Sequence, residues 1–170
     1  MTPLRCTETF FSRDVLEVAP ALLSSCLVRK DENGLKRFRI TEVEAYRGEE
    51  DLACHASRGK TSRTRVMYLQ GGYLYIYLIY GMYWMMNIVT GRKDEPQAAL
   101  IRGMEGISGP GRVTRHLRID KSFSGENLLI SDRIWIESGS AEVPYKTTPR
   151  IGIDYAGEPW KSMPWRFLAL

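Results

Sequence analysis

The chain has 170 residues, of which 44% are hydrophobic and 26% charged, which suits one domain, residues 1–170, with its own buried core. Lys and Arg outnumber Asp and Glu by 24 to 20, and this net charge of +4 favours a polyanionic partner without establishing one. The most apolar stretch, Tyr73 to Met86, is shorter than the roughly 20 residues that a membrane helix needs, which excludes a membrane span.

Cysteine usage and the N-terminus bear on the compartment. Cys6, Cys26 and Cys54 are far apart and form no C-x-x-C pair, so neither a disulfide framework nor a zinc or iron–sulfur site is predicted. No other metal or cofactor is predicted. Met1 to Asp14 lacks the apolar run of a secretory signal. We therefore expect a reducing compartment: the cytoplasm, with nucleoid association in a bacterium, or the nucleus in a eukaryote.

The first part of the chain predicts a helix followed by a β-hairpin. Ser12 can cap a helix that reaches Leu23, because apolar residues recur at helical spacing between them. Asn33-Gly34 favours a positive φ and a tight reversal, which predicts a hairpin between Cys26–Arg29 and Leu35–Tyr46.

The second strand of this hairpin carries an unusual pattern. Side chains alternate between the two faces of a strand, so one face receives Phe38, Ile40, Glu42, Glu44 and Tyr46. Two carboxylates on a face that begins with large apolar side chains break the rule that acids stay off a core face. Such breaks concentrate at functional sites, which makes this strand the first candidate for one.

The middle of the chain predicts a basic loop and a second hairpin. Asp51–His55 has the length of one helical turn. The loop after it is basic through four side chains: Arg58, Lys60, Arg63 and Arg65. Aromatic and β-branched residues then predict strands at Tyr73–Ile79 and Trp84–Val89, with Tyr80 to Tyr83 at the hairpin tip.

The rest of the chain predicts a strand, a short helix and scattered strands. Gln97–Met104 fits a strand, and Gly109-Pro-Gly111 opens a helix over Arg112–Leu117. Three short segments are the remaining strand candidates: Ile134–Ile136, Arg150–Ile153 and Trp165–Leu168. The expected fold class is α+β: a single compact domain with a curved antiparallel sheet, surrounding short helices and a protruding β-hairpin.

Glu42 and Glu44 are candidates for acid–base chemistry. A carboxylate can take a proton from water that attacks a sugar carbon, and its charge stabilises an oxocarbenium-like centre. Strand rise places the two residues about 6–7 Å apart, which also suits the paired acids of a carbohydrate glycosidase. However, Glu-x-Glu on a strand more often forms a solvated or salt-bridged face. The pattern alone therefore does not distinguish a water-activating glutamate, a pair of glycosidase acids and such a face.

Aromatic and polar side chains could form a pocket for a base. Tyr46, Tyr77 and His55 offer stacking faces, and Asn87 offers groups that read a base edge. Cross-strand packing of the tyrosines and turn satisfaction by the asparagine are the structural alternatives. Tyr80 at a hairpin tip suits a wedge that fills the gap left by a flipped nucleotide, while burial against a neighbouring loop is its alternative.

An ordered series of motifs runs from about Phe10 to the C-terminus: Arg39-Ile-Thr-Glu-Val-Glu-Ala-Tyr46, Asp51-Leu-Ala-Cys-His55, Ser57-Arg-Gly59, Tyr73-Leu-Tyr-Ile-Tyr-Leu-Ile-Tyr-Gly-Met-Tyr83, Met86-Asn87, Leu100-Ile-Arg102, Gly109-Pro-Gly111 and Arg150-Ile-Gly-Ile153. In these motifs the chain resembles the alkyladenine (3-methyladenine) DNA glycosylase family. The resemblance implies a compact mixed fold with an antiparallel sheet and no metal.

The resemblance implies roles for the residues around the reacting bond. Glu44 matches the glutamate that activates water, and Arg102 matches an arginine beside that water. A main-chain carbonyl within Ile151–Ile153 is also implied to contact the water. Tyr80 matches an intercalating tyrosine.

The resemblance also implies the substrate. Tyr46 and His55 match one wall of a base sandwich, Tyr77 matches the opposite wall, and Asn87 matches an asparagine that disfavours guanine. The implied activity is monofunctional hydrolysis of the N-glycosidic bond of alkylated or deaminated purines, such as 3-methyladenine and hypoxanthine. The product is an abasic site in base excision repair.

The expected partner is double-stranded DNA that contains a damaged purine, bound by a monomer. Basic side chains are expected to hold its phosphates: Arg58, Lys60, Arg63, Arg65, Arg112 and Arg115. The alternative is a non-catalytic nucleic-acid-binding module, in which the tyrosines stack bases and Glu44 is structural. The ordered motifs favour the enzyme.

Overall fold

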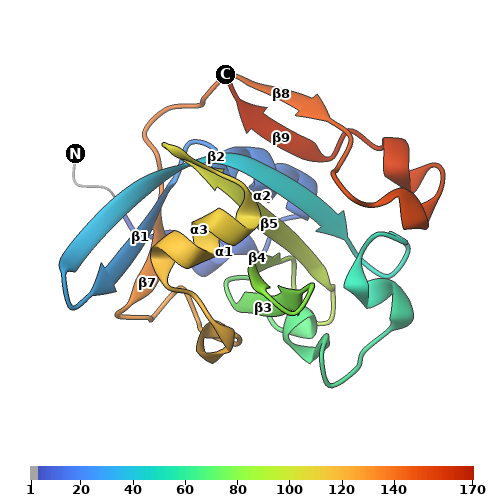
Figure 1. The fold of residues 1–170 in the computed structure, drawn as a ribbon, viewed down its shortest axis with the longest axis horizontal. Coiled ribbons are helices and arrows are strands. Elements are labelled where there is room, and N and C mark those ends of the chain that lie inside the picture. Colours follow the sequence, from blue (N-terminus) through green and yellow to red (C-terminus); the bar gives the residue numbers. More distant parts are fainter. Residues whose placement is uncertain (1–3) are drawn as a thin grey trace.

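A nine-stranded antiparallel sheet forms the frame of the computed structural model, which describes residues 4–170 (Figure 1). Its main path has the order β3-β4-β5-β2-β1-β7, with β6 beside β5, and with β9 paired to both β2 and β8. The strands are β1 (Cys26–Asp31), β2 (Gly34–Arg47), β3 (Leu74–Ile79), β4 (Tyr83–Thr90), β5 (Gln97–Met104), β6 (Ile107–Ser108), β7 (Ile134–Glu137), β8 (Tyr145–Thr148) and β9 (Arg166–Ala169).

Strand β2 is central because three strands pair with it. Its first part pairs with β1, as the predicted hairpin requires, and its second part pairs with β5. Strand β9 pairs with Glu42–Glu44. The segment Glu42–Glu44 is therefore hydrogen-bonded to a neighbouring strand on each side, which fixes its backbone firmly.

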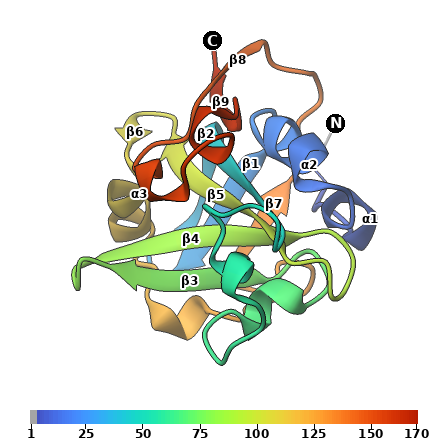
Figure 2. The ribbon, with the colours of Figure 1, turned by 90° about the vertical axis from the view of Figure 1, so that its right-hand side faces the viewer.

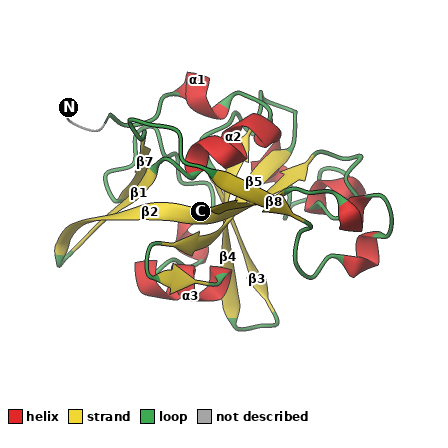
Figure 3. Cartoon of the chain, turned by 90° about the horizontal axis from the view of Figure 1, so that it is seen from above, coloured by secondary structure: helices red, strands yellow, loops and turns green. Residues whose placement is uncertain are grey.

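Short helices cover the sheet: α1 (Glu8–Phe11), α2 (Val15–Leu22) and α3 (Pro110–Leu117). Helix α2 packs against β2 and β5, whereas α3 packs against β4 and β5. Figure 3 shows α1 and α2 on one side of the sheet and α3 on the other. The predicted α+β class is confirmed. Within residues 4–170, no helix has the length and apolar character needed to cross a membrane.

The hydrophobic core joins these helices to the sheet. Its largest fully buried side chains include Leu22, Leu117, Met86 and Ile101, which come from α2, α3, β4 and β5. Burial of each such side chain contributes about 1.5–3 kcal/mol, so the helices hold the sheet strands together through shared apolar contacts.

The N-terminal helix begins at a different cap from the predicted one. Asp14 is the N-cap of α2, and its carboxylate accepts a hydrogen bond from the Leu16 backbone N at 2.9 Å. Ser12 instead closes α1, where its backbone N–H bonds to the Glu8 carbonyl. The Asp14 carboxylate also forms an ion pair with Arg47, at the end of β2, at 2.9 Å. This second contact favours Asp14 over Ser12 as the cap.

A double irregularity changes the strand parity that the sequence predicts. The ladder between β2 and β5 shifts on either side of Glu42, so Thr41 on one strand and Arg102 on the other are skipped. Ile40 consequently packs into the main hydrophobic core, beside residues that face away from Glu44. The prediction that Ile40 and Glu44 share one face is therefore wrong.

The later elements agree with the sequence in part. Strand β5 has the predicted bounds, α3 begins two residues earlier than predicted, and β9 is shifted by one residue. The strand predicted at Arg150–Ile153 is wrong: this segment is a bend in which Gly152 has a φ of 73° and the Arg150 side chain is buried. After Asp51 the chain forms a turn at residues 52–53 and a bend at residue 54, and a 3₁₀ helix follows at His55–Arg58.

Strands β3 and β4 form the predicted second hairpin, whose tip projects from the body of the molecule (Figure 2). Ile79 pairs with Tyr83, which leaves Tyr80, Gly81 and Met82 as the connecting loop. This tip adjoins the surface on which the predicted site residues gather.

Candidate active site

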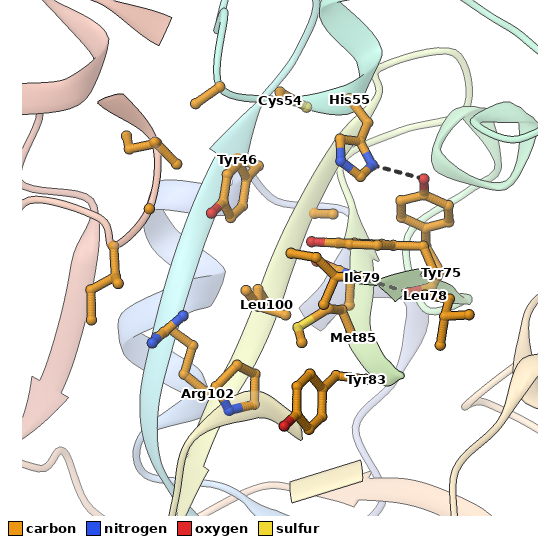
Figure 4. Close-up of a pocket in the computed structure, with 18 of the residues that line it drawn as sticks. Tyr46, Cys54, His55, Tyr75, Leu78, Ile79, Tyr83, Met85, Leu100 and Arg102 are labelled. Atoms are coloured by element: carbon orange, nitrogen blue, oxygen red, sulfur yellow. Dashed lines mark hydrogen bonds between the residues drawn. The ribbon is translucent and has the colours of Figure 1, made fainter. Parts of the chain in front are cut away.

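A pocket of about 1150 Å³ opens beside the β3–β4 hairpin. Strand β5, the 3₁₀ helix His55–Arg58 and the C-terminal loop at Ile151–Ile153 form its other walls. Figure 4 shows His55, Tyr75 and Tyr83 along one side of this pocket, and Tyr46 and Arg102 on the other. Most of the predicted site residues line it: Tyr46, His55, Tyr77, Tyr80, Asn87 and Arg102.

The Glu44 carboxylate lies directly behind the pocket wall and has no exposed surface. Its Oε2 accepts a hydrogen bond from the Tyr46 hydroxyl at 2.8 Å, and its Oε1 accepts one from the Ile151 backbone N at 2.8 Å. The Arg102 Nε lies 3.4 Å from Oε1. These three neighbours line the pocket, so the buried carboxylate is compensated by groups that also border the open space.

Glu42 lies beside this group but is bound differently. Its Oε1 accepts hydrogen bonds from Arg102 Nε at 2.9 Å and from Arg166 Nε at 2.7 Å. Glu42 does not line the pocket, and its Oε1 is already occupied by two guanidinium donors. The geometry therefore gives no support to a pair of acids of the carbohydrate glycosidase kind.

Tyr46 is a hydrogen-bond donor held in a fixed position. Burial, followed by the neighbouring Glu44 charge, raises the pKa of the Tyr46 phenol well above its usual value. The hydroxyl therefore keeps its proton and donates a hydrogen bond to Glu44. Behind the ring, the Arg150 guanidinium lies 4.8 Å from the ring centroid, an arrangement typical of a cation–π contact.

His55, Tyr75 and Tyr77 form an aromatic cluster in the pocket. The His55 and Tyr77 ring centroids are 4.5 Å apart, and the His55 Nδ1 lies 2.9 Å from the Tyr75 hydroxyl (Figure 4). Burial, followed by the charges of Arg63 and Arg58, lowers the pKa of His55 to about 4. This part of the pocket wall is therefore uncharged at neutral pH.

Asn87 is buried in β4 opposite Tyr75 of β3. Its Nδ2 donates a hydrogen bond to the Tyr75 carbonyl at 3.1 Å. This bond restrains the orientation of the carboxamide, whose edge borders the pocket. Asn87 can therefore present fixed polar atoms to a ligand.

The hairpin tip presents a strained aromatic residue to solvent. Tyr80 is 82% exposed and adopts a φ of 53°, a region in which residues other than glycine are uncommon. Met82 beside it is 64% exposed. The alternative that Tyr80 is buried against a neighbouring loop is therefore wrong, since its ring lies largely in solvent.

The predicted basic residues separate into two groups. Arg58, Arg63 and Arg112 line the pocket, and the Arg63 guanidinium lies 5.4 Å from the Tyr77 ring centroid. The others are exposed beyond the pocket lining: Lys60, Arg65 and Arg115. Lys60 Nζ lies 3.7 Å from a carboxylate oxygen of Asp94. Among residues 4–170, no three His, Cys, Asp or Glu side chains are grouped so that they could hold a metal ion.

A buried ion pair supports the site, and its pairing was missed at the level of sequence. Arg150 Nη1 lies 2.6 Å from Asp51 Oδ2, Arg150 Nη2 lies 3.0 Å from Oδ1, and both side chains have no exposed surface. Arg150 also donates to the Ala45 carbonyl at 3.0 Å. The available signal was that Asp51 and Arg150 both stand in motifs that carry the family resemblance, although nothing local indicated that they meet.

The comparison with known families agrees with this geometry. A family described as methylpurine-DNA glycosylase (MPG) matches residues 9–108 and 105–170. The chain belongs to this family. The predicted family and the predicted enzyme class, a hydrolase that acts on N-glycosyl bonds in DNA, are confirmed.

Similar proteins cover nearly the whole chain. The names of the relatives below include the words "3-methyladenine DNA glycosylase". One from Methanocella arvoryzae is 42% identical over 93% of this chain and 88% of its own length. Relatives from Legionella pneumophila and Borreliella burgdorferi are 43% and 41% identical, again over 93% of this chain, and over 90% and 92% of their own lengths.

Asp51→Asn should destabilise the fold, because it leaves the buried Arg150 guanidinium without its counter-charge. We expect the free energy of unfolding in urea to fall by about 3–5 kcal/mol. Asp154→Asn, at an exposed position in the same region, is the control. A loss below about 1 kcal/mol in Asp51→Asn would show that the pair does not hold the loops together.

His55 should make stability depend on pH. An unfolded histidine titrates near 6.5, so with a folded pKa of about 4 the unfolded state binds more protons between these values. Its contribution to stability is therefore present above pH 6.5 and is lost as the pH falls toward 4. We expect His55→Gln to lose less unfolding free energy between pH 7 and pH 5 than the native protein. Exposed His116→Gln is the control, and equal losses in both variants would contradict the prediction.

Proposed function

We propose that this DNA glycosylase flips a damaged purine out of double-stranded DNA and hydrolyses its N-glycosidic bond, with Glu44 as the residue that activates water. The proposed substrates are alkylated or deaminated purines, such as 3-methyladenine and hypoxanthine. The product is an abasic site in base excision repair. The observation that carries the proposal is the buried Glu44 carboxylate, hydrogen-bonded at the wall of an aromatic pocket.

Glu44 retains the capacity to accept one more hydrogen bond. An ionised carboxylate offers about four lone-pair sites, and Tyr46, Ile151 and Arg102 approach it with three donors. A water held at the remaining site would attack C1′ while Glu44 takes its proton. As the C1′–N bond breaks, the base departs with the bonding electron pair, and the carboxylate stabilises the positive charge that develops on the sugar.

The pocket suits a flat base more than a sugar. The rings of Tyr46, His55 and Tyr77 all line it. His55 and Tyr77 pack against each other with ring centroids 4.5 Å apart, so a base stacked between them requires these two rings to move apart. We assign Tyr46 and His55 to one wall of the base site and Tyr77 to the other, with Asn87 against guanine. A cationic base such as 3-methyladenine leaves easily, so the enzyme needs mainly to position it and to supply water.

The surface around the pocket suits duplex DNA. Tyr80 projects from the hairpin tip as a wedge for the gap left by the flipped nucleotide. The phosphate contacts assigned are Arg58, Lys60, Arg63, Arg65, Arg112 and Arg115. We propose that the protein acts as a monomer on the DNA of the cell, in the cytoplasm or nucleoid of a bacterium or in the nucleus of a eukaryote.

Glu44→Gln tests the proposed water activation. General-base catalysis contributes about 10²–10⁴-fold, so we expect base release from methylated duplex DNA under single-turnover conditions to fall at least about 100-fold. Glu105→Gln, at an exposed position after β5, is the control and should keep the native rate. Equal release by Glu44→Gln and native protein would refute the role of Glu44. Duplex binding without release of 3-methyladenine or hypoxanthine by the native protein would instead support a non-catalytic binding module.

Tyr80→Ala tests the wedge. Because stacking on a base contributes about 1–3 kcal/mol, we expect affinity for a lesion-containing duplex to weaken roughly 5- to 100-fold, with no loss of thermal stability at this exposed position. Tyr80→Phe should retain most of the affinity. Ile130→Ala, at a position that is 79% exposed, is the control. Native affinity in Tyr80→Ala would rule out intercalation by this residue.

A further inference from the structure

Behind Arg102 lies a second layer of charged side chains to which the proposed mechanism assigns no role. Glu42 is 11% exposed and Arg166 is 20% exposed at the side chain. One carboxylate oxygen, Glu42 Oε1, receives both Arg102 Nε at 2.9 Å and Arg166 Nε at 2.7 Å. Arg102 is therefore held from behind by Glu42, which is itself held by Arg166.

The topology of β2 brings this layer together. Strand β9 runs along the edge of β2 opposite β5, and Arg166 pairs with Glu44 in that ladder. The irregularity around Glu42 allows Glu42 and Arg102, from neighbouring strands, to reach the same site. Gly103 makes room for the Glu42 side chain, since a Cβ at position 103 would lie only 3.1 Å from the Glu42 Cβ.

The layer also balances charge around Glu44. Two carboxylates, Glu42 and Glu44, share the Arg102 Nε at 2.9 and 3.4 Å, and Arg166 supplies the second positive charge. Titratable or charged groups surround Glu44 in two layers. Tyr46 and Arg102 approach its carboxylate, and the charge of Glu44 also acts on Tyr77 and Tyr155. Farther out, Glu42 and Arg166 lie behind Arg102, and Arg150 lies behind the Tyr46 ring. Removal of the Glu42 charge therefore makes the surroundings of Glu44 more positive, whereas removal of the Arg166 charge makes them more negative.

We infer that Glu42 and Arg166 are positioning residues, which act through Arg102 to set its place and the charge balance beside Glu44. The inference rests on the proposed function of Glu44 and Arg102. Arg166 Nη1 also bonds to Thr148 Oγ1 at 3.2 Å, so β8 and β9 contribute to the site through this arginine. Neither Glu42 nor Arg166 lines the pocket, and neither is assigned contact with the reacting atoms.

The test compares Glu42→Gln, Arg166→Gln and the double variant by single-turnover release of 3-methyladenine as a function of pH, with spontaneous release subtracted. Arg37→Gln is the matched control, because it breaks another ion pair of β2, Arg37 with Glu137 at 2.7 Å, and neither of these residues lines the pocket. Urea unfolding of each variant identifies any that fail to fold. Arg166→Lys, which keeps the charge, serves as the milder substitution.

We expect each single variant to lower the plateau rate by about 10- to 100-fold, because Arg102 loses its fixed position. The acid limb of the rate profile should move by roughly one pH unit, in opposite directions. It moves to higher pH in Arg166→Gln, where excess negative charge favours protonation of Glu44. It moves to lower pH in Glu42→Gln, where excess positive charge opposes protonation. The double variant should return the limb toward its native position while its rate stays low.

Arg166→Lys should keep the native acid limb and lose rate, since lysine carries the charge without the planar Nε donor. Native rates in both single variants, or limbs that move in the same direction, would overturn the inference while base release by the native protein and its loss in Glu44→Gln still stand. If Glu44→Gln keeps the native rate, the proposed function fails, and the inference fails with it.

Discussion

The buried ion pair between Asp51 and Arg150 is the interaction on which the site depends. Removal of two charges from water is costly, and only good geometry with further hydrogen bonds offsets that cost. Here Asp51 accepts from the backbone N of Arg47 at 3.0 Å and of Ala53 at 3.1 Å, besides the two bonds from Arg150. The pair therefore joins the end of β2 to the C-terminal loop. In this loop the next residue, Ile151, directs its backbone N–H at Glu44.

Glu44 follows the same principle on a smaller scale. Its carboxylate is fully buried, and the donors that compensate it come from three parts of the chain: β2, β5 and the C-terminal loop. Each donor is in turn fixed by other contacts, with Tyr46 against Arg150 and Arg102 against Glu42. A substitution at Arg150 or Glu42 is therefore expected to affect Glu44 indirectly, through Tyr46 or Arg102. Among residues 4–170, the groups that approach the Glu44 carboxylate oxygens are Tyr46, Ile151 and Arg102.

The sequence predicted correctly the features that depend on local or repeating residue patterns. Alternation and turn chemistry predicted both hairpins, and strand parity placed Glu44 and Tyr46 on one face, where they hydrogen-bond at 2.8 Å. It missed the irregularity at Thr41 and Arg102, because an inserted residue leaves the hydrophobic pattern of each strand readable but shifts its phase. It also missed the pairing of Asp51 with Arg150, which are 99 residues apart. Such a contact is set by the tertiary fold and leaves no local signal.

Rigidity and strain are placed in different parts of this molecule, and the proposed chemistry gives a reason. Glu44, Tyr46 and Asn87 are held by hydrogen bonds within the protein, so little reorganisation is needed when positive charge develops at the sugar. Tyr80 is the opposite case: its left-handed backbone costs free energy and its exposed ring recovers little by packing. The ordered β3–β4 ladder sustains that cost, and a stacked base pair would give the ring the contacts that the protein alone does not provide.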